Sequence, residues 1–186
     1  MGDPHWSDIS CFKTTRFGLF KDEKEMTKVI IDNVYKLPDN IMLIINGDIF
    51  DFDHLQSCCW NKQVKIIMGN HDVDTKGYKL NKIKKMKEQL MFDIEIINNN
   101  IYKLEKCDNI LISHYPIPKL PDNCLNIHGH YHNMNGYGSY NMFYNTGFWP
   151  KNKYYNSCID YNNLAPVNLR SIFCNMRIFT LPFEEK

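Results

Sequence analysis

Four short polar motifs in this 186-residue chain each follow directly on an apolar run of strand length. The apolar runs are IMLIIN, VKIIM, NILI and CLNIH, and the motifs that follow them are Gly47-Asp48, Gly69-Asn70-His71-Asp72, Ser113-His114 and Gly129-His130. Ligands of α/β sheets bind at the carboxyl ends of the strands. Glycine permits the sharp turn that points the next side chain into a shared site. We therefore expect an α/β fold that gathers these motifs in one place.

The rest of the chain shows helix and strand patterns but no linker or repeat. A helix over about 22–37 is predicted from Met26, Val29, Ile30 and Val34 on one face, with an aspartate at its start to cap it. Asn98-Asn99-Asn100 predicts a hairpin turn. The other predicted elements are strands at 41–45, 64–68, 94–97, 101–104, 110–112, 125–127, 142–144 and 157–160, a lysine-rich helix at about 77–90, and a helix or strand at 169–176.

Composition excludes several classes of protein. Lysine plus arginine number 22 and aspartate plus glutamate 21, so the net charge of +1 offers no extended nucleic-acid surface. The seven cysteines are scattered and no secretory signal opens the chain, which favours a cytoplasmic protein without disulfides. Cys58 and Cys59 are expected to be buried rather than reactive. No apolar run is long enough to cross a membrane.

The chemistry of the motifs points to metal binding once Asp3-x-His5 and the second histidine, His132, are added. Taken singly, each residue is better explained as part of an ordinary loop or turn. As a set, Asp, His and Asn suit Mn, Fe, Zn or Co, and a carboxylate such as Asp48 can bridge two ions. Two ions about 3.5–4 Å apart can clamp a phosphoryl group and generate hydroxide near neutral pH. A neighbouring non-ligand histidine can steady charge or protonate the leaving group.

The ordered set resembles the calcineurin-like metallophosphoesterases, especially the small bacterial and phage members. The motifs that carry the resemblance are Asp3-x-His5, Gly47-Asp48, Gly69-Asn70-His71-Asp72, Ser113-His114-Tyr115-Pro116 and Gly129-His130-Tyr131-His132, followed by Asn156-Ser-Cys-Ile-Asp160 and Pro166-Val167. The resemblance implies a single domain over 1–186. Its fold would be a two-sheet mixed β sandwich flanked by helices.

The resemblance also implies the roles of individual residues. One divalent ion would be held by Asp3, His5, Asp48 and His132, and the second by Asp48, Asn70, His114 and His130. Asp48 would bridge the two ions, for which Mn²⁺ is expected, with Fe, Zn, Co or Ni as alternatives. His71 would be the catalytic histidine that faces the phosphate. Asp72 is placed with it in the catalytic group, because it would orient either the loop or His71.

Other residues near the motifs have two interpretations each. His128 is either a support for the metal ligands or a buried structural residue. Trp6 and Phe52 either form walls of a substrate pocket or pack in the core, and Tyr115 and Tyr131 carry the same ambiguity. His54 is expected on a surface helix or loop near the mouth of the site.

One departure from the family pattern concerns the start of the sequence. In the family a central strand precedes the Asp-x-His motif, whereas only Met1 and Gly2 precede Asp3 here. The first strand is therefore expected to be missing or truncated. Our hypothesis is a natural reading frame that begins about 5–8 residues earlier, one strand length. A stop codon directly upstream of Met1 would contradict it.

The function predicted from the sequence is hydrolysis of a phosphomonoester or phosphodiester, with nucleotides among the candidate substrates. The alternative is a catalytically inactive, protein-binding scaffold that keeps the same fold. A nuclease is a third interpretation, which the near-neutral charge disfavours. Substrate specificity would come from the loops at 52–61, 116–123 and 133–140.

Overall fold

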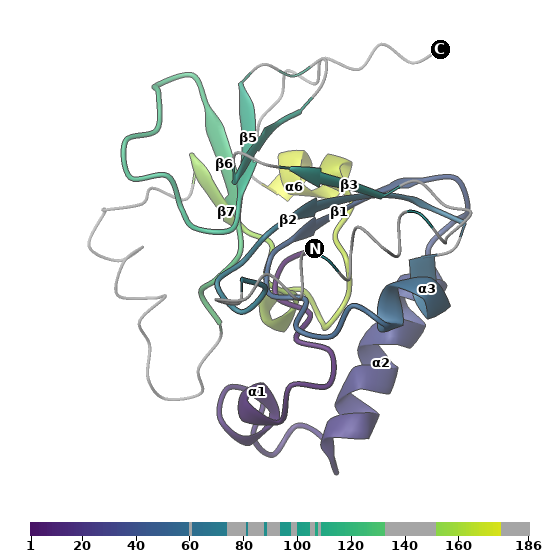
Figure 1. Ribbon diagram of the computed structural model, residues 1–186. Coiled ribbons are helices and arrows are strands. Elements are labelled where there is room, and N and C mark those ends of the chain that lie inside the picture. Colours follow the sequence, from purple (N-terminus) through teal and green to yellow (C-terminus); the bar gives the residue numbers. More distant parts are fainter. Residues whose placement is uncertain are drawn as a thin grey trace.

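The first of two β-sheets is entirely parallel. The computed structural model describes residues 1–59, 61–73, 81, 88, 94–97, 100–104, 107, 109–132 and 152–175. Within them β1 (Met42–Asn46), β2 (Gln63–Ile67) and β3 (Ile94–Ile97) form a sheet in the order β1-β2-β3. Leu43 pairs with Val64, and Val64 with Ile94. The parallel arrangement brings the carboxyl ends of the three strands to one edge (Figure 1).

The second sheet is mixed. It contains β4 (Ile101–Lys103), β5 (Ile110–Ser113), β6 (Leu125–His128) and β7 (Tyr154–Asn156) in that order. β4 runs antiparallel to β5, whereas β5, β6 and β7 are parallel. Together with the first sheet and its helices, this confirms the expected two-sheet α/β fold.

Helices α2 (Glu23–Tyr35) and α3 (His54–Cys59) cover one face of the first sheet (Figure 1). The Asp22 side chain accepts a hydrogen bond from the Glu25 amide and caps α2 as expected. Met26, Ile30 and Val34 of α2 are completely buried in a core cluster with side chains of β1 and β2. This apolar face, with its helical spacing, holds the helix against the sheet.

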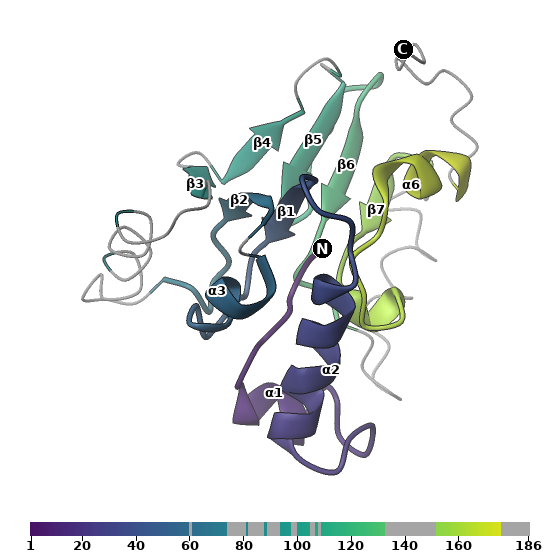
Figure 2. The ribbon, with the colours of Figure 1, turned by 90° about the vertical axis from the view of Figure 1, so that its right-hand side faces the viewer.

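A second core cluster lies between the sheets. It joins Ile67 at the end of β2 to Ile112 and Ile127 of the second sheet. The short helix α6 (Leu169–Asn175) adds Ile172 and Phe173 to this cluster, and Figure 2 shows α6 beside β7. The segment 169–176, which the sequence left open between helix and strand, is therefore helical as far as residue 175.

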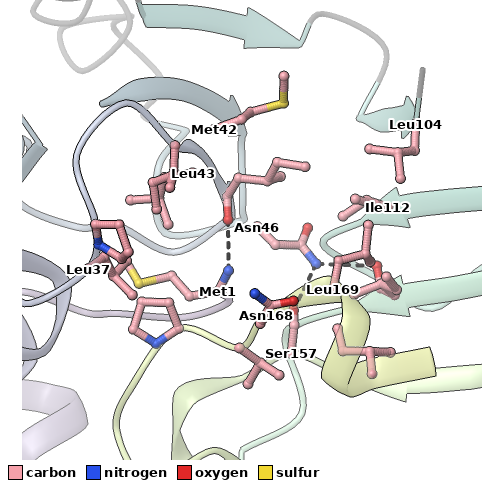
Figure 3. A pocket seen from close by; sticks show the side chains of 17 residues that line it. Met1, Leu37, Met42, Leu43, Asn46, Leu104, Ile112, Ser157, Asn168 and Leu169 are labelled. Carbon is pink, nitrogen blue, oxygen red and sulfur yellow. Dashed lines mark hydrogen bonds between the residues drawn. The ribbon is translucent and has the colours of Figure 1, made fainter. Parts of the chain in front are cut away.

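Met1 and Gly2 occupy a strand position between the two sheets. The Met1 ammonium donates to the Ile44 carbonyl (Figure 3). The Asn46 backbone amide donates to the Met1 carbonyl. Gly2 pairs on its other side with the second sheet, because its amide donates to Ser157 and its carbonyl accepts from Ile159. These two residues lie where the sequence led us to expect the first strand. Burial lowers the pKa of the Met1 amino group to about 6.

A largely apolar cavity of about 440 Å³ lies beside Met1. Its lining includes Met42 to Ile44 of β1, Ile112, Ile127 and Leu169 (Figure 3). The cavity therefore runs along β1 beside Met1, and Ile44 and Asn46, which contact Met1, are part of its lining.

Two predictions about secondary structure are wrong. The strands on either side of Asn98-Asn99-Asn100 do not pair as the predicted hairpin, because β3 belongs to the first sheet and β4 to the second; residues 98 and 99 lie outside the described residues. The strand predicted at 157–160 lies three residues earlier as β7, and Ile159–Tyr161 forms a 3-10 turn. The lysine-rich helix at 77–90, apart from residues 81 and 88, and the strand at 142–144 lie outside the described residues.

No helix in the described part of the chain is long and apolar enough to cross a membrane. The cysteines that the structure describes form no disulfide, as expected from the sequence. Cys58 and Cys59 are buried in the first core cluster with free thiols.

Asn126 on β6 secures the loop that follows β5. Its amide donates to the Leu111 carbonyl and the Ser113 hydroxyl, and its carbonyl oxygen accepts from the Ile117 amide. Because Asn126 is fully buried, Asn126→Ala leaves these groups without partners. We expect the free energy of unfolding to fall by about 2–4 kcal/mol in urea titrations. Asn123→Ala at an exposed position should change it by less than about 0.5 kcal/mol, and equal losses would contradict this role for Asn126.

Candidate metal centre

The polar motifs after β1, β2, β5 and β6 meet at one edge of the two sheets. Asp48 lies at the centre of this group. One of its oxygens, Oδ2, lies 3.6 Å from His5 Nε2 and 3.4 Å from His114 Nε2. Its other oxygen, Oδ1, accepts a hydrogen bond of 2.9 Å from the His71 amide. A single carboxylate oxygen thus faces one histidine from the N-terminal loop and one from the second sheet.

Two groups of potential ligands share this carboxylate. Asp3, His5 and Asp48 form the first, and Asp48, His114 and His130 form the second. In each group the potential ligand atoms all lie within 4.8 Å of one another. Each of these two groups contains only residues of one expected ligand set, and Asp48 is common to both.

Asn70 and His132 lie beside these two groups. Asn70 Oδ1 is 3.0 Å from His114 Nε2, on the side of the second group. The His132 ring lies 5.0 Å from the His5 ring, measured between centroids, on the side of the first. All seven predicted metal ligands are therefore close together in the structure.

Two buried thiols, Cys11 and Cys158, also lie near His132. Burial raises the pKa of Cys11 to about 12 and that of Cys158 well above its usual range. Metals bind the thiolate rather than the thiol. The ligand sets expected from the sequence contain neither cysteine and consist of oxygen and nitrogen donors only.

His5 shows most directly that the group fits a metal ion. Its Nδ1 is hydrogen-bonded to Asp8 at 2.7 Å, whereas its buried Nε2 has no hydrogen-bond partner. An unsatisfied buried nitrogen is costly in a folded protein. A carboxylate that holds one ring nitrogen while the other faces a metal is the usual arrangement for histidine ligands. Burial would raise the pKa of Asp8, but its hydrogen bonds with His5 and the Cys11 amide hold it at about 2.

The backbone at the centre is strained. Asp3, His5, Asp48 and His130 all have positive φ angles, between 47° and 68°. This left-handed region is unfavourable for residues with a side chain and concentrates at functional sites. Gly129 supports the close packing there, because a Cβ atom on it would lie 2.5 Å from Asp3 Oδ2.

Comparison with known proteins identifies the family. The family model described as calcineurin-like phosphoesterase matches residues 1–174. The chain belongs to the calcineurin-like phosphoesterase family. Members of this family are mostly metal-dependent hydrolases that hold two divalent ions. No curated protein and no solved structure gave a significant match to the chain.

The two residues predicted to be catalytic have different surroundings. The His71 side chain is exposed, and its ring centroid lies 5.0 Å from that of His5. Asp72 is buried and accepts hydrogen bonds from the amides of Ile49, Phe50 and Gly69. Asp72 therefore connects the loops that follow β1 and β2.

The structure decides between the two interpretations of Trp6 and Phe52. Trp6 and Phe52 are buried in the first core cluster, so they pack in the core. His128 is also fully buried, and burial lowers its pKa to about 4. His54 begins α3, and its Nε2 is hydrogen-bonded to the Ser7 hydroxyl. Tyr115 is 50% exposed and does not belong to either core.

Three charged residues support the centre in roles that were not predicted from the sequence. Asp8 holds His5, and Asp160 is hydrogen-bonded to Nδ1 of His132. Arg16 is completely buried and donates to Asp160 Oδ1 and to the carbonyl oxygens of Asp3 and Pro4. Asp8 could have been recognised as a helix cap, since it caps α1 (Ile9–Lys13). Arg16 and Asp160 are 144 positions apart, and no local pattern links them.

Gly47 provides a test of the close packing at the centre. It has a φ of 83°, and a Cβ atom there would overlap His114 Nδ1. Gly47→Ala should therefore lower the free energy of unfolding in two ways. The positive φ costs about 1–2 kcal/mol, and the overlap with His114 costs about 1–3 kcal/mol more. Gly18 is the matched control, because its φ is 77° and a Cβ atom added to it would have no neighbour within 4 Å. Equal losses of unfolding free energy in both variants would show that His114 is not constrained by Gly47.

Asp160 provides a test of the supporting charges. Hydrogen bonds with His132 and Arg16 outweigh burial and hold the pKa of Asp160 well below its usual range. Asp160→Asn leaves the Arg16 guanidinium buried without a carboxylate, so unfolding free energy should fall by about 3–5 kcal/mol at pH 7. Because the pKa of Asp160 is lower in the folded state, this stabilisation is complete above pH about 4 and is lost as the pH falls further.

Urea titrations between pH 7 and pH 3 measure both effects. The gap between Asp160→Asn and the unmodified protein should narrow in acid. Asp122→Asn is the control, because that carboxylate is exposed and pairs with Lys153 at the surface, and no measurable change is expected. A gap of constant size at all pH values would contradict the ion-pair explanation.

Proposed function

We propose that this protein is a phosphoesterase that uses two divalent ions to hydrolyse a phosphomonoester or phosphodiester with water. Asp3, His5, Asp48 and His132 hold one ion in this proposal. Asp48, Asn70, His114 and His130 hold the other. Mn²⁺ is the proposed metal, because the donors are oxygens and imidazole nitrogens without thiolate.

The observation that carries the proposal is the position of Asp48. Its Oδ2 lies within 3.6 Å of ring nitrogens from both ligand groups. Because His5 Nε2 and Asp48 are both buried, a cation between them would supply the partner that the imidazole nitrogen lacks. In such a centre, bound divalent ions activate water and neutralise charge on the phosphoryl group.

The lowered pKa of His130 supports this assignment. Burial and the neighbouring His114 lower the pKa of His130, which favours the neutral ring that a metal ligand requires. His132 differs, because its hydrogen bond with Asp160 outweighs burial and raises its pKa. That hydrogen bond occupies Nδ1 and leaves Nε2 as the ligand atom.

His71 is the proposed catalytic side chain outside the ligand sets. Its amide is fixed by Asp48, and its exposed ring stands beside His5. From this position the imidazole would contact the phosphate and either steady the developing charge or protonate the leaving group. Asp72 contributes indirectly, because it holds the loop from which His71 projects.

Metal content and turnover test the proposal together. The protein reconstituted with Mn²⁺ should bind two equivalents per chain and cleave a chromogenic phosphomonoester or phosphodiester. Asp48→Asn removes charge shared by both sites, so kcat/KM should fall by about 10³-fold or more. Asp32→Asn replaces an exposed carboxylate on α2 and should leave the rate unchanged.

The alternative of an inactive binding scaffold predicts a different result. A protein that binds two equivalents of Mn²⁺ but turns over neither class of ester would overturn the enzymatic proposal. Failure to bind any metal would also remove the role assigned to Asp48.

A further inference from the structure

A second cavity, of about 340 Å³, opens beside the proposed metal centre. Asn70 and His114 form part of its wall, so it is continuous with the second ligand group. The remaining lining comes mainly from the end of β2, the start of β4 and the loop after β5. Its volume falls in the range of pockets that hold small organic molecules, about 300–1,000 Å³.

The wall away from the metal centre is apolar and faces solvent. Val73, Ile101 and Tyr115 are 69%, 43% and 50% exposed, and the half-buried Ile117 and the buried Pro116 also line the cavity. Among the described residues that line the cavity there is no lysine, arginine or carboxylate. A charged group placed there would lose water without gaining an opposite charge, which is unfavourable. The lining therefore favours an uncharged apolar occupant.

Tyr115 joins the apolar wall to the metal centre. Its hydroxyl donates to Asn70 Oδ1 at 3.1 Å, and its ring centroid lies 4.3 Å from that of His130. The tyrosine ring is thus held beside two proposed metal ligands while half of the side chain stays exposed. An aromatic group bound through its phosphate at the metals would find this ring within reach of stacking or edge contacts.

The loop that carries this wall is held in place before any ligand binds. The Ser113 hydroxyl donates to the Tyr115 carbonyl, the Ile117 amide to Asn126, and the Tyr154 hydroxyl to the Ile117 carbonyl. Prolines at positions 116 and 118 restrict the backbone further. A wall fixed in this way favours binding, because little conformational freedom is lost.

We propose that this cavity receives the organic group of the phosphate ester and selects an uncharged aromatic one. The inference rests on the proposed function, since the metal centre would hold the phosphate. It adds a substrate class, aryl-bearing phosphate esters, which the metal ligands alone do not specify.

Two esters separate recognition of the organic group from reactivity. Benzyl phosphate and 2-hydroxyethyl phosphate release alcohols of similar acidity, so the bond cleaved is closely matched in both. With the Mn²⁺-loaded protein, kcat/KM should be higher for benzyl phosphate by about tenfold or more. A ratio near one, or a preference for 2-hydroxyethyl phosphate, would overturn the inference while leaving the phosphoesterase proposal intact.

A matched pair of variants assigns the preference to the cavity. Ile101→Asn places an amide in the apolar wall and should reduce the benzyl preference at least threefold. Ile9→Asn changes a comparably exposed isoleucine on α1, outside the cavity, and should leave the preference unchanged. Thermal unfolding of both variants checks that each is folded. A folded Ile101→Asn protein with an unaltered preference would overturn the inference.

Binding measurements distinguish failure of this inference from failure of the proposed function. Benzylphosphonate and 2-hydroxyethylphosphonate cannot be hydrolysed, and calorimetry gives their affinities for the Mn²⁺-loaded protein. Tighter binding of benzylphosphonate, reduced in Ile101→Asn, supports the cavity even if neither monoester is turned over. The enzymatic proposal then fails only if the chromogenic phosphodiester is not cleaved either. If the two phosphonates bind with equal affinity and both esters are hydrolysed at equal rates, the enzymatic proposal stands and the proposed aromatic preference fails.

Discussion

The backbone of Met1 and Gly2 joins the two sheets, and the proposed metal centre depends on this joint. Met1 pairs with β1 and Gly2 with the segment after β7, so the next residue, Asp3, emerges between the sheets. The ligand groups draw on both sides, since Asp48 follows β1 whereas His114 and His130 follow β5 and β6. Two residues of extended chain therefore determine how the halves of the centre face one another.

Buried charged groups connect the N-terminal segment to the C-terminal part of the chain. Arg16 contacts the carbonyl oxygens of Asp3 and Pro4 and the carboxylate of Asp160, which in turn holds His132. A buried arginine is stable only when its charge and donors are matched. Here the matching groups come from the loop that carries Asp3 and His5 and from the turn after β7. The positions of these ligands are thus coupled to a part of the chain remote in sequence.

Much of the site could be predicted from the sequence because its motifs are local. Gly47-Asp48 and Gly129-His130 follow apolar runs, and parallel strands place such ends together. The bounds of the strand that ends at Asn156 were predicted three residues too late. The pairing of β3 and β4 was also predicted wrongly, because an asparagine-rich segment is compatible with a hairpin and with a connection between sheets. The ion pair of Arg16 with Asp160 depends on tertiary packing across 144 positions, which neither periodicity nor spacing encodes.

The positive φ angles of Asp3, His5, Asp48 and His130 have a thermodynamic consequence. Each such residue costs about 1–3 kcal/mol, which the surrounding contacts must offset in the folded chain. Ions that bind only this arrangement stabilise the folded state by mass action. Metal binding and local order at the centre are therefore linked. Without bound metal, relaxation of the loops that carry these four residues releases backbone strain, while the two hydrophobic clusters keep the sheets in place.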